Sequence, residues 1–258
     1  MYTMGIDVGS ASSKVVILED GVNVVAAEVI QVGTGSSGPQ RALEKAFEVS
    51  GLKMEDMTKI VATGYGRFAL KEADKQVSEI SCHAKGIFFL VPEARTIIDI
   101  GGQDAKAIRL DNKGFVKQFF MNDKCAAGTG RFLDVMARVL EITLDDMAEY
   151  DSRATEIASI SSTCTVFAES EVISQLSKGV SKENIIAGVH QSVASKACGL
   201  AYRGGLEDAV VMTGGVAKNA GVVRAISREL NREVIVAPNP QTTGALGAAL
   251  FAYEEAKR

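Results

Sequence analysis

The chain of 258 residues contains no tryptophan and only two histidines. With so few imidazole rings, a zinc site or a catalytic relay built on histidine is poorly supplied. The four cysteines form no C-x-x-C pair, so the most familiar spacing of a metal or dithiol site is missing. No apolar run approaches the roughly 20 residues that a membrane-spanning helix needs. The net charge of -4 argues against nucleic acid or an anionic membrane as the main partner.

What is present is typical of a globular protein, with 47% apolar and 23% charged residues. The N-terminus shows no basic segment followed by an apolar stretch, so the expected location is the cytoplasm. In that reducing compartment each cysteine is expected to be a buried apolar residue, a reactive thiol or a metal ligand. Predicted strands alternate with predicted helices, and hairpins recur, which predicts the α/β class.

A strand, a glycine-bearing turn and a second apolar strand occur twice. The copies align at one constant offset, as Asp7-x-Gly9 with Lys14 and as Asp99-x-Gly101 with Lys106. A hairpin turn follows each copy, at residues 20–21 and 112–114. This duplication favours two similar half-domains that each offer one turn to a phosphate chain. The alternative for each copy is a simple tight turn between strands.

Backbone N–H groups in such a turn can point at an anion, and the missing glycine Cβ allows close approach. The candidate phosphate contacts in the first copy are Gly9, Ser10, Ala11, Ser12, Ser13 and Lys14. In the second copy they are Gly101, Gly102, Gln103 and Asp104. The carboxylates of Asp7 and Asp99 cannot bind phosphate directly but suit a hydrated Mg²⁺ held through water.

Later segments add candidate nucleotide contacts. A predicted buried strand at 209–213 runs into Gly214-Gly215, where a flat base or ribose can lie against the backbone. The further candidates are Gly128, Thr129, Gly130, Gly214, Gly215, Val216, Lys218, Asn219 and Gln241. Small residues at 242–249 suit close helix packing in a core or at a hinge. The glycine- and serine-rich segment 33–39 is expected to be a flexible surface turn.

The order of these glycine motifs resembles that of the actin, Hsp70 and sugar-kinase ATPase superfamily, over nearly the whole chain. The motifs are the two Asp-x-Gly turns, Gly128-Thr129-Gly130, Gly214-Gly215 and Gly244-Ala245. The resemblance implies two ribonuclease-H-like half-domains with an ATP cleft between them. Residues 1–92 plus 238–258 would form the first half, and residues 93–237 would form the second half.

Two cysteines stand just before predicted helices. Cys125 precedes the glycines at 128–130, and Cys164 precedes a helix that begins near Phe167. A thiolate at a helix N-terminus is stabilised by the helix dipole. Two such thiolates supply half of the four ligands of an iron–sulfur cluster, and a two-fold dimer would supply the rest. Ordinary buried or helix-capping cysteines are the alternative.

The other two cysteines, Cys82 and Cys198, lie within predicted helices and are expected to be core thiols. His83 neighbours Cys82 but faces a different direction on a helix, so a joint metal site is not expected. His190 is expected to be a surface or packed residue.

The segments 99–104, 122–130 and 163–170 are similar to the activator components of 2-hydroxyacyl-CoA dehydratases and the related ATPase subunits of benzoyl-CoA reductases. The resemblance implies a homodimer with one [4Fe-4S] cluster, bound by Cys125 and Cys164 of each subunit. It also implies that ATP hydrolysis to ADP drives a low-potential electron, received from reduced ferredoxin or flavodoxin, into a dehydratase. A helix starting near Gly128 would then aim its positive end at the cluster. Gln103 and Asp104 are the candidates for orienting the attacking water and Mg²⁺.

Two other functions share this fold. A metabolite kinase, acting on a sugar or an acid, would need an acid–base carboxylate, for which Asp104 could serve. A filament-forming or chaperone-like ATPase would need polymer contacts or an appended peptide-binding domain, for which no segment is apparent. The ATP-driven electron activator is the favoured hypothesis.

Overall fold

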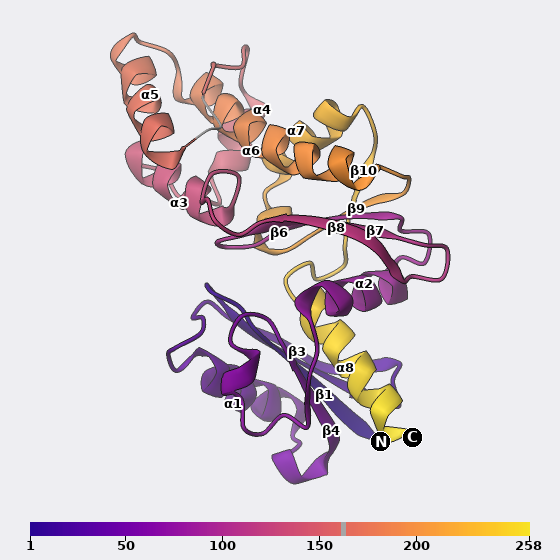
Figure 1. The fold of residues 1–258 in the computed structure, drawn as a ribbon. Helices are drawn as coiled ribbons and strands as arrows, with labels where there is room; N and C mark the ends of the chain where they lie inside the picture. The colour runs from indigo at the N-terminus through magenta and orange to yellow at the C-terminus, as the bar shows by residue number, and fades with distance from the viewer. Residues whose placement is uncertain (161–163) are drawn as a thin grey trace. The chain divides into compact units, whose positions relative to one another are not determined.

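Two five-stranded sheets organise the chain, which the computed structural model describes at residues 1–160 and 164–258. The chain divides into two compact units, coloured along the sequence in Figure 1. The first unit comprises Met1–Ala94, Leu110–Lys117 and Ala237–Arg258, and the second comprises Arg95–Arg109 and Gln118–Val236. The predicted half-domain limits at 92 and 238 stay a prediction.

The first unit contains a sheet of order β3-β2-β1-β4-β5. Strand β1 pairs antiparallel with β2 and parallel with β4. The strands are β1 (Tyr2–Val8), β2 (Ser13–Glu19), β3 (Asn23–Ile30), β4 (Met57–Thr63) and β5 (Lys75–Gln76). The helices are α1 (Gly38–Ser50), α2 (Glu79–Leu90) and α8 (Thr243–Ala256), with short 3₁₀ turns η1 (Met54–Asp56) and η2 (Arg67–Ala69).

The second unit repeats this plan with a sheet of order β10-β9-β6-β7-β8. Its central strand β6 pairs antiparallel with β7 and parallel with β9. The strands are β6 (Thr96–Ile100), β7 (Ala105–Leu110), β8 (Val116–Asn122), β9 (Val210–Thr213) and β10 (Val234–Val236). The helices are α3 (Gly130–Val139), α4 (Met147–Ser152), α5 (Thr165–Ser177), α6 (Lys182–Gly204) and α7 (Ala220–Leu230), with a 3₁₀ turn η3 (Gly215–Lys218).

Helices cover both faces of the first sheet, because successive side chains of a strand point to opposite faces. In β2, Val15 and Ile17 lie in one apolar cluster with Leu43 of α1, while Val16 and Leu18 lie in another with residues of α8. The second unit has a larger apolar core that joins β6, β7 and β9 to α3, α6 and α7. Strands and helices share these cores, which confirms the α/β class.

Small residues let α8 pack closely against α2 and β1. A Cβ added at Gly247 of α8 would overlap the carbonyl oxygen of Cys82 in α2. A Cβ at Gly5 of β1 would overlap the carbonyl oxygen of Ala245. Of the two roles expected for the small residues at 242–249, packing in a core or at a hinge, these contacts support packing in a core.

The start of the segment at 33–39 is held by two hydrogen bonds. Thr34 N–H donates to Gly9 O at 2.9 Å, and Ser13 Oγ–H donates to Val32 O at 2.9 Å. Gly35, Ser36 and Ser37 are exposed, so the predicted surface turn lies there. Its start is bonded to the first glycine-rich turn, a contact that sequence inspection did not indicate.

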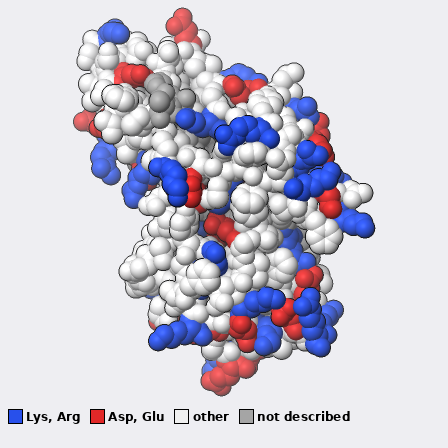
Figure 2. Space-filling view, in the orientation of Figure 1, with Lys and Arg blue, Asp and Glu red and all other residues white. Residues whose placement is uncertain are grey.

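Charged side chains of both signs are interspersed over the face shown in Figure 2, as a net charge of only -4 would suggest. Within the described ranges, no helix is both long enough and apolar enough to cross a bilayer.

Two helical glycines give a direct test of the packing between α2 and α8. Gly247→Ala should destabilise the protein by about 2 kcal/mol or more, because the new methyl has no room beside Cys82 O. Gly199→Ala is the matched control: it lies on the exposed side of α6 and meets nothing within 4 Å. That change should add about 1 kcal/mol from helix propensity. Urea unfolding measures both, and equal stability of the two variants would contradict the packing described.

Candidate functional site

The first glycine-rich turn joins β1 to β2. Asp7 lies opposite Lys14 in the antiparallel register, and Lys14 Nζ donates to Asp7 Oδ2 at 3.0 Å. Gly9 N–H closes the turn by donating to Ser12 O at 3.0 Å. The ion pair therefore spans the hairpin directly beneath the turn.

The second turn, between β6 and β7, has the same geometry. Asp99 lies opposite Lys106, and Lys106 Nζ donates to Asp99 Oδ2 at 3.0 Å. Gly101 N–H donates to Asp104 O at 2.9 Å. Equal spacing in the sequence thus corresponds to the same paired side chains and the same turn hydrogen bond.

The structure extends the repeat to a third position that sequence inspection missed. Gly64 follows β4 with φ +84°, and Gly214 follows β9 with φ +87°. A Cβ at Gly64 would overlap Asp7 Oδ1, and a Cβ at Gly214 would lie 2.6 Å from Asp99 Oδ1. Only glycine combines this backbone conformation with such close approach. The available signal was a Thr-Gly pair after an apolar run, present at 63–64 and again at 213–214.

The two turns differ in charge. Lys106, whose side chain is 1% exposed, lies between two carboxylates, with Asp104 Oδ2 at 2.8 Å in addition to Asp99. Lys14 is 14% exposed and pairs with Asp7, and serine stands at position 12, which aligns with Asp104. In the first unit, Asp7 Oδ1 is buried with no hydrogen-bond partner among the described residues. The second turn therefore carries one more negative charge, and the first has an unused buried acceptor.

Three glycine-bearing segments of the second unit meet where β6 and β9 end. The N–H groups of Gly130 and Arg131 donate to the carbonyls of Gly101 and Gly102 at 2.9 and 2.8 Å. A Cβ at Gly130 would lie 3.6 Å from Val216 in η3. The structure thus brings together the predicted segments at 101–104, 128–130 and 214–216.

The start of α3 is hydrogen-bonded to the second glycine-rich turn. Its first two N–H groups are used by the turn, so they are not available to a group at Cys125. Thr129 is fully buried, and its hydroxyl donates to Ala126 O at 2.7 Å. The helix is therefore attached to the glycine-rich turn, and the expected direct effect of its positive end on Cys125 has no support in these contacts.

The remaining candidates are distributed over both units. In the second unit, Gln103, Gly215 and Lys218 are exposed, and Asn219 caps α7. Ser10, Ala11, Ser12 and Ser13 form the first turn, where Ser12 and Ser13 are buried. Gln241 belongs to the first unit and precedes the start of α8.

Cys125 lies in the loop between β8 and α3. The side chain of Asn122 holds this loop through both of its polar atoms: Nδ2 donates to Cys125 O at 2.8 Å, and Oδ1 accepts from Cys125 N–H at 3.3 Å. Cys164 is the N-cap residue of α5, and its carbonyl accepts from Ala168 N–H at 3.0 Å. Both thiols are partly exposed. Of the motif at 163–170, Thr163 lies outside the described residues.

Cys82 and Cys198 have a different environment. Both are buried in helices, which confirms that they are core thiols. Burial raises the pKa of each of these two thiols to about 12. At neutral pH they are protonated and poor metal ligands, since a metal binds the thiolate.

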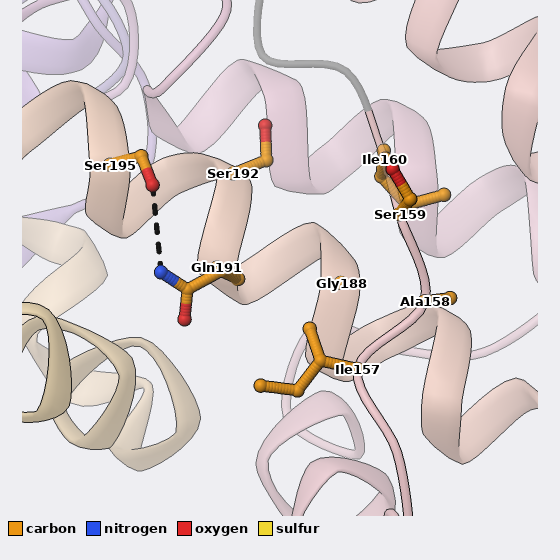
Figure 3. A pocket seen from close by; sticks show the side chains of 8 residues that line it. All are labelled: Ile157, Ala158, Ser159, Ile160, Gly188, Gln191, Ser192 and Ser195. Carbon is orange, nitrogen blue, oxygen red and sulfur yellow. Dashed lines mark hydrogen bonds between the residues drawn. The ribbon is translucent and has the colours of Figure 1, made fainter.

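A small pocket of about 220 Å³ lies elsewhere in the second unit, between α6 and the irregular segment 157–160 (Figure 3). Its lining residues are Ile157, Ala158, Ser159, Ile160, Gly188, Gln191, Ser192 and Ser195. Gln191 donates to Ser195 Oγ and to Glu229, so its amide is engaged within the protein. None of the predicted site residues lines this pocket.

Comparison with known proteins places this geometry in a family. The family model described as the BadF/BadG/BcrA/BcrD ATPase family matches residues 4–252. The activator of lactoyl-CoA dehydratase from Anaerotignum propionicum is 80% identical, with both chains covered completely. The structure of the activator of 2-hydroxyisocaproyl-CoA dehydratase from Clostridium difficile with bound ADPNP has a TM-score of 0.97 and 57% identity, covering 100% of this chain and 96% of that one.

A second solved structure, component A of (R)-2-hydroxyglutaryl-CoA dehydratase from Acidaminococcus fermentans, has a TM-score of 0.97 and 56% identity over the full length of both chains. A glucokinase from Streptomyces griseus shares the fold alone, with a TM-score of 0.60 and 12% identity over 98% of this chain and 100% of that one. The fold is thus that of the actin, Hsp70 and sugar-kinase ATPases. The chain belongs to the BadF/BadG/BcrA/BcrD ATPase family.

The buried Lys106 should be required for stability. Lys106→Met leaves two buried carboxylates without their cation and should cost about 3–5 kcal/mol. Lys14→Met is the matched control, and it should cost less because Lys14 is more exposed and serine stands at the position that aligns with Asp104. Adding Asp104→Asn to Lys106→Met should restore part of the loss, which urea unfolding can measure. Equal costs for the two lysine variants would show that the charge arrangement at Lys106 is not important.

The cysteine environments predict a labelling pattern. In metal-free native protein at pH 8, iodoacetamide should modify Cys125 and Cys164, because both are partly exposed. Cys82 and Cys198 should react only after unfolding, because they are buried and their pKa is raised to about 12. Peptide mass spectrometry before and after denaturation gives the sites. Modification of Cys82 in the native protein would contradict its assignment to the core.

Proposed function

We propose that the protein is an ATP-dependent one-electron activator of a 2-hydroxyacyl-CoA dehydratase. One observation carries this proposal. Within the second unit, hydrogen bonds and a short stretch of chain connect a candidate phosphate turn to a candidate cluster ligand. The turn at 101–104 is bonded to the start of α3, and Cys125 lies five residues before that helix begins. Relatives that are 56–80% identical are named as activators or as the activating component of such dehydratases, which supports this proposal.

In the first unit, the proposed nucleotide contacts are the turn at 9–14 and Gln241. In the second unit, they are the turn at 101–104 and the segments 128–130 and 214–219. The relative with bound ADPNP supports nucleotide binding. Among the candidate Mg²⁺ groups, Asp7 fits best, because its Oδ1 is buried without a hydrogen-bond partner in the described part of the chain and suits a metal-bound water. Asp99 is less suited, because among the described residues its Oδ1, unlike that of Asp7, is not a buried acceptor without a hydrogen-bond partner. Mg²⁺, when bound, would neutralise phosphate charge.

Gln103 and Asp104 are proposed to act on the attacking water. Gln103 is exposed at the tip of the turn, where it is accessible to a ligand. Asp104 is buried and paired with Lys106, so an ionised carboxylate is held next to the turn. Of the two, Gln103 suits the orientation of water, and Asp104 suits the fixing of the turn.

Cys125 and Cys164 of each subunit would hold one [4Fe-4S] cluster in a homodimer. The donor set fits, because these two thiols are partly exposed while the other two are buried. On α5, directly after Cys164, Val166 and Phe167 are each 67% exposed and Ile173 is 51% exposed. This exposed apolar face supports contact with a second copy beside the thiol. The cluster, when bound, would supply one-electron transfer.

The same contacts suggest how ATP hydrolysis would act on the cluster ligand. A shift of Gly101 and Gly102 would move Gly130 and Arg131, because their backbone groups are hydrogen-bonded. The loop carrying Cys125 precedes these residues and is held at its other side by Asn122. The proposed partners are a 2-hydroxyacyl-CoA dehydratase and reduced ferredoxin or flavodoxin. The proposed location is the cytoplasm, since free thiols and a cluster both need reducing conditions.

A metabolite kinase is the less supported alternative. The glucokinase likeness has 12% identity and therefore concerns the fold only. Asp104 is the carboxylate that a kinase would use as a base, but it is already paired with buried Lys106. The partly exposed thiols would have no role in such an enzyme.

The iron content tests the proposed function. After anaerobic purification, wild-type protein should contain about two irons and two acid-labile sulfides per chain, as a four-iron cluster shared by two chains requires. Cys125→Ser and Cys164→Ser should each abolish both, because each removes two of the four ligands. Cys198→Ala is the control in the same unit and should keep the iron. Absence of iron from folded wild-type protein that binds ATP would contradict the electron-transfer function.

A further inference from the structure

A hydrogen-bonded network in the second unit joins Asn219 to residues that have no role in the proposed site. His190 of α6 is completely buried. A buried imidazole needs a hydrogen-bond partner for each ring nitrogen, and His190 has both. Nδ1 lies 3.1 Å from Asp151 Oδ1 of α4, and Nε2 lies 3.2 Å from Nδ2 of Asn219. His190 therefore connects α4 to the residue between η3 and α7.

The capping of α7 by Asn219 shows which ring nitrogen of His190 is the donor and which is the acceptor. Asn219 Oδ1 accepts from the N–H groups of Gly221 and Val222 at 2.9 and 3.2 Å. The amide nitrogen of Asn219 therefore faces the ring, and as a donor it requires an acceptor at Nε2. A neutral ring with an acceptor at Nε2 carries its proton on Nδ1, which then donates to Asp151.

The other contacts of the network agree with this arrangement. Asp151 Oδ2 pairs with Arg224 Nη2 at 2.5 Å. Burial acts to raise the pKa of Asp151, but hydrogen bonds from His190 and Arg224 outweigh it and hold the pKa below its usual value. Asp151 is therefore ionised and suited to accept from Nδ1–H. A Cβ at Gly221 would overlap the ring, so glycine at that position lets the helix start reach His190.

This network ends at the nucleotide segment proposed above. Asn219 directly follows η3, and its own N–H donates to Val216 O at 2.9 Å. Val216 contacts the start of α3 at Gly130, and Gly214 lies against Asp99. The oxygen of Asn219 is already used by two N–H groups, so the side chain is better suited to fix this segment than to contact a ligand.

We propose that His190, as the neutral Nδ1–H tautomer, is a positioning residue for the nucleotide segment, acting through the hydrogen bond that its Nε2 accepts from Asn219. Asp151 selects the tautomer, and Asn219 transmits the constraint to η3 and to the first turn of α7. The inference rests on the proposed ATP site, which it deepens by naming a residue that fixes part of that site without touching the nucleotide.

Two isosteric variants separate positioning from stability. His190→Gln places an amide oxygen near the position of Nε2, so it keeps an acceptor for Asn219 and loses the donor to Asp151. His190→Asn places an amide nitrogen near Nδ1, so it keeps the donor and loses the acceptor. Both should lower the melting temperature. Only His190→Asn should also weaken ATP binding, by about threefold to tenfold, the effect of one net hydrogen bond.

Isothermal titration calorimetry with ATP and Mg²⁺ gives the affinities, and thermal unfolding gives the stabilities. Weaker binding by His190→Asn than by His190→Gln would support the proposal, and equal affinities would overturn it. If wild-type protein binds no ATP, the proposed function itself fails, and the positioning role fails with it.

The tautomer can be measured without any nucleotide. The chain has only two histidines, so protein labelled with ¹⁵N-histidine gives two sets of ring signals, and His190→Gln assigns them. The signals of His190 should be those of a neutral ring protonated at Nδ1. A ring protonated at Nε2, or a charged ring, at pH 7 would overturn the inference even if the protein binds ATP.

Discussion

The pairing of an aspartate at the end of a central strand with a lysine across the hairpin organises each unit. In the second unit the pair is almost fully buried, and Lys106 also contacts Asp104. An unpaired charge at that depth would be costly, so both carboxylates and the amine must keep their places. The turn of Gly101 and Gly102 lies directly above this pair. Its backbone is thereby fixed in the position from which it accepts hydrogen bonds from α3.

The two units use one plan for different purposes. Gly64 and Gly214 approach the two aspartates in the same way, so the strand arrangement around each carboxylate is shared. The first unit has serine at position 12, and Asp7 Oδ1 accepts no hydrogen bond from any residue that the structure describes, which suits a hydrated cation. The second unit has Asp104 at the equivalent position and carries both partly exposed thiols. Cation binding is therefore proposed for the first unit and coupling to the thiols for the second.

Local hydrogen bonds connect the second glycine-rich turn to Cys125, and the proposed coupling between ATP hydrolysis and the cluster would act through them. From the second turn it passes through backbone bonds to the start of α3, and from there along five residues to Cys125. Asn122 fixes the far side of this loop by contacts to the backbone of Cys125 and Ala127. On the opposite side of the turn, Val216 and Asn219 connect the same region to His190. Short polar contacts, in place of a long flexible linker, thus join the candidate nucleotide and cluster residues of this unit.

The sequence by itself determined the α/β class, the duplicated turns and the two cysteines outside the core, because these depend on local spacing and on residue type. Asp7 and Lys14, like Asp99 and Lys106, are close in the chain and meet across a hairpin that local signals predict. Only the tertiary structure decided that Gly64 and Gly214 are equivalent, that α3 is bonded to Gly101 and Gly102, and that His190 meets both Asp151 and Asn219. These contacts join residues that are distant in the sequence, and they depend on how strands and helices pack. No periodicity or short motif encodes that packing.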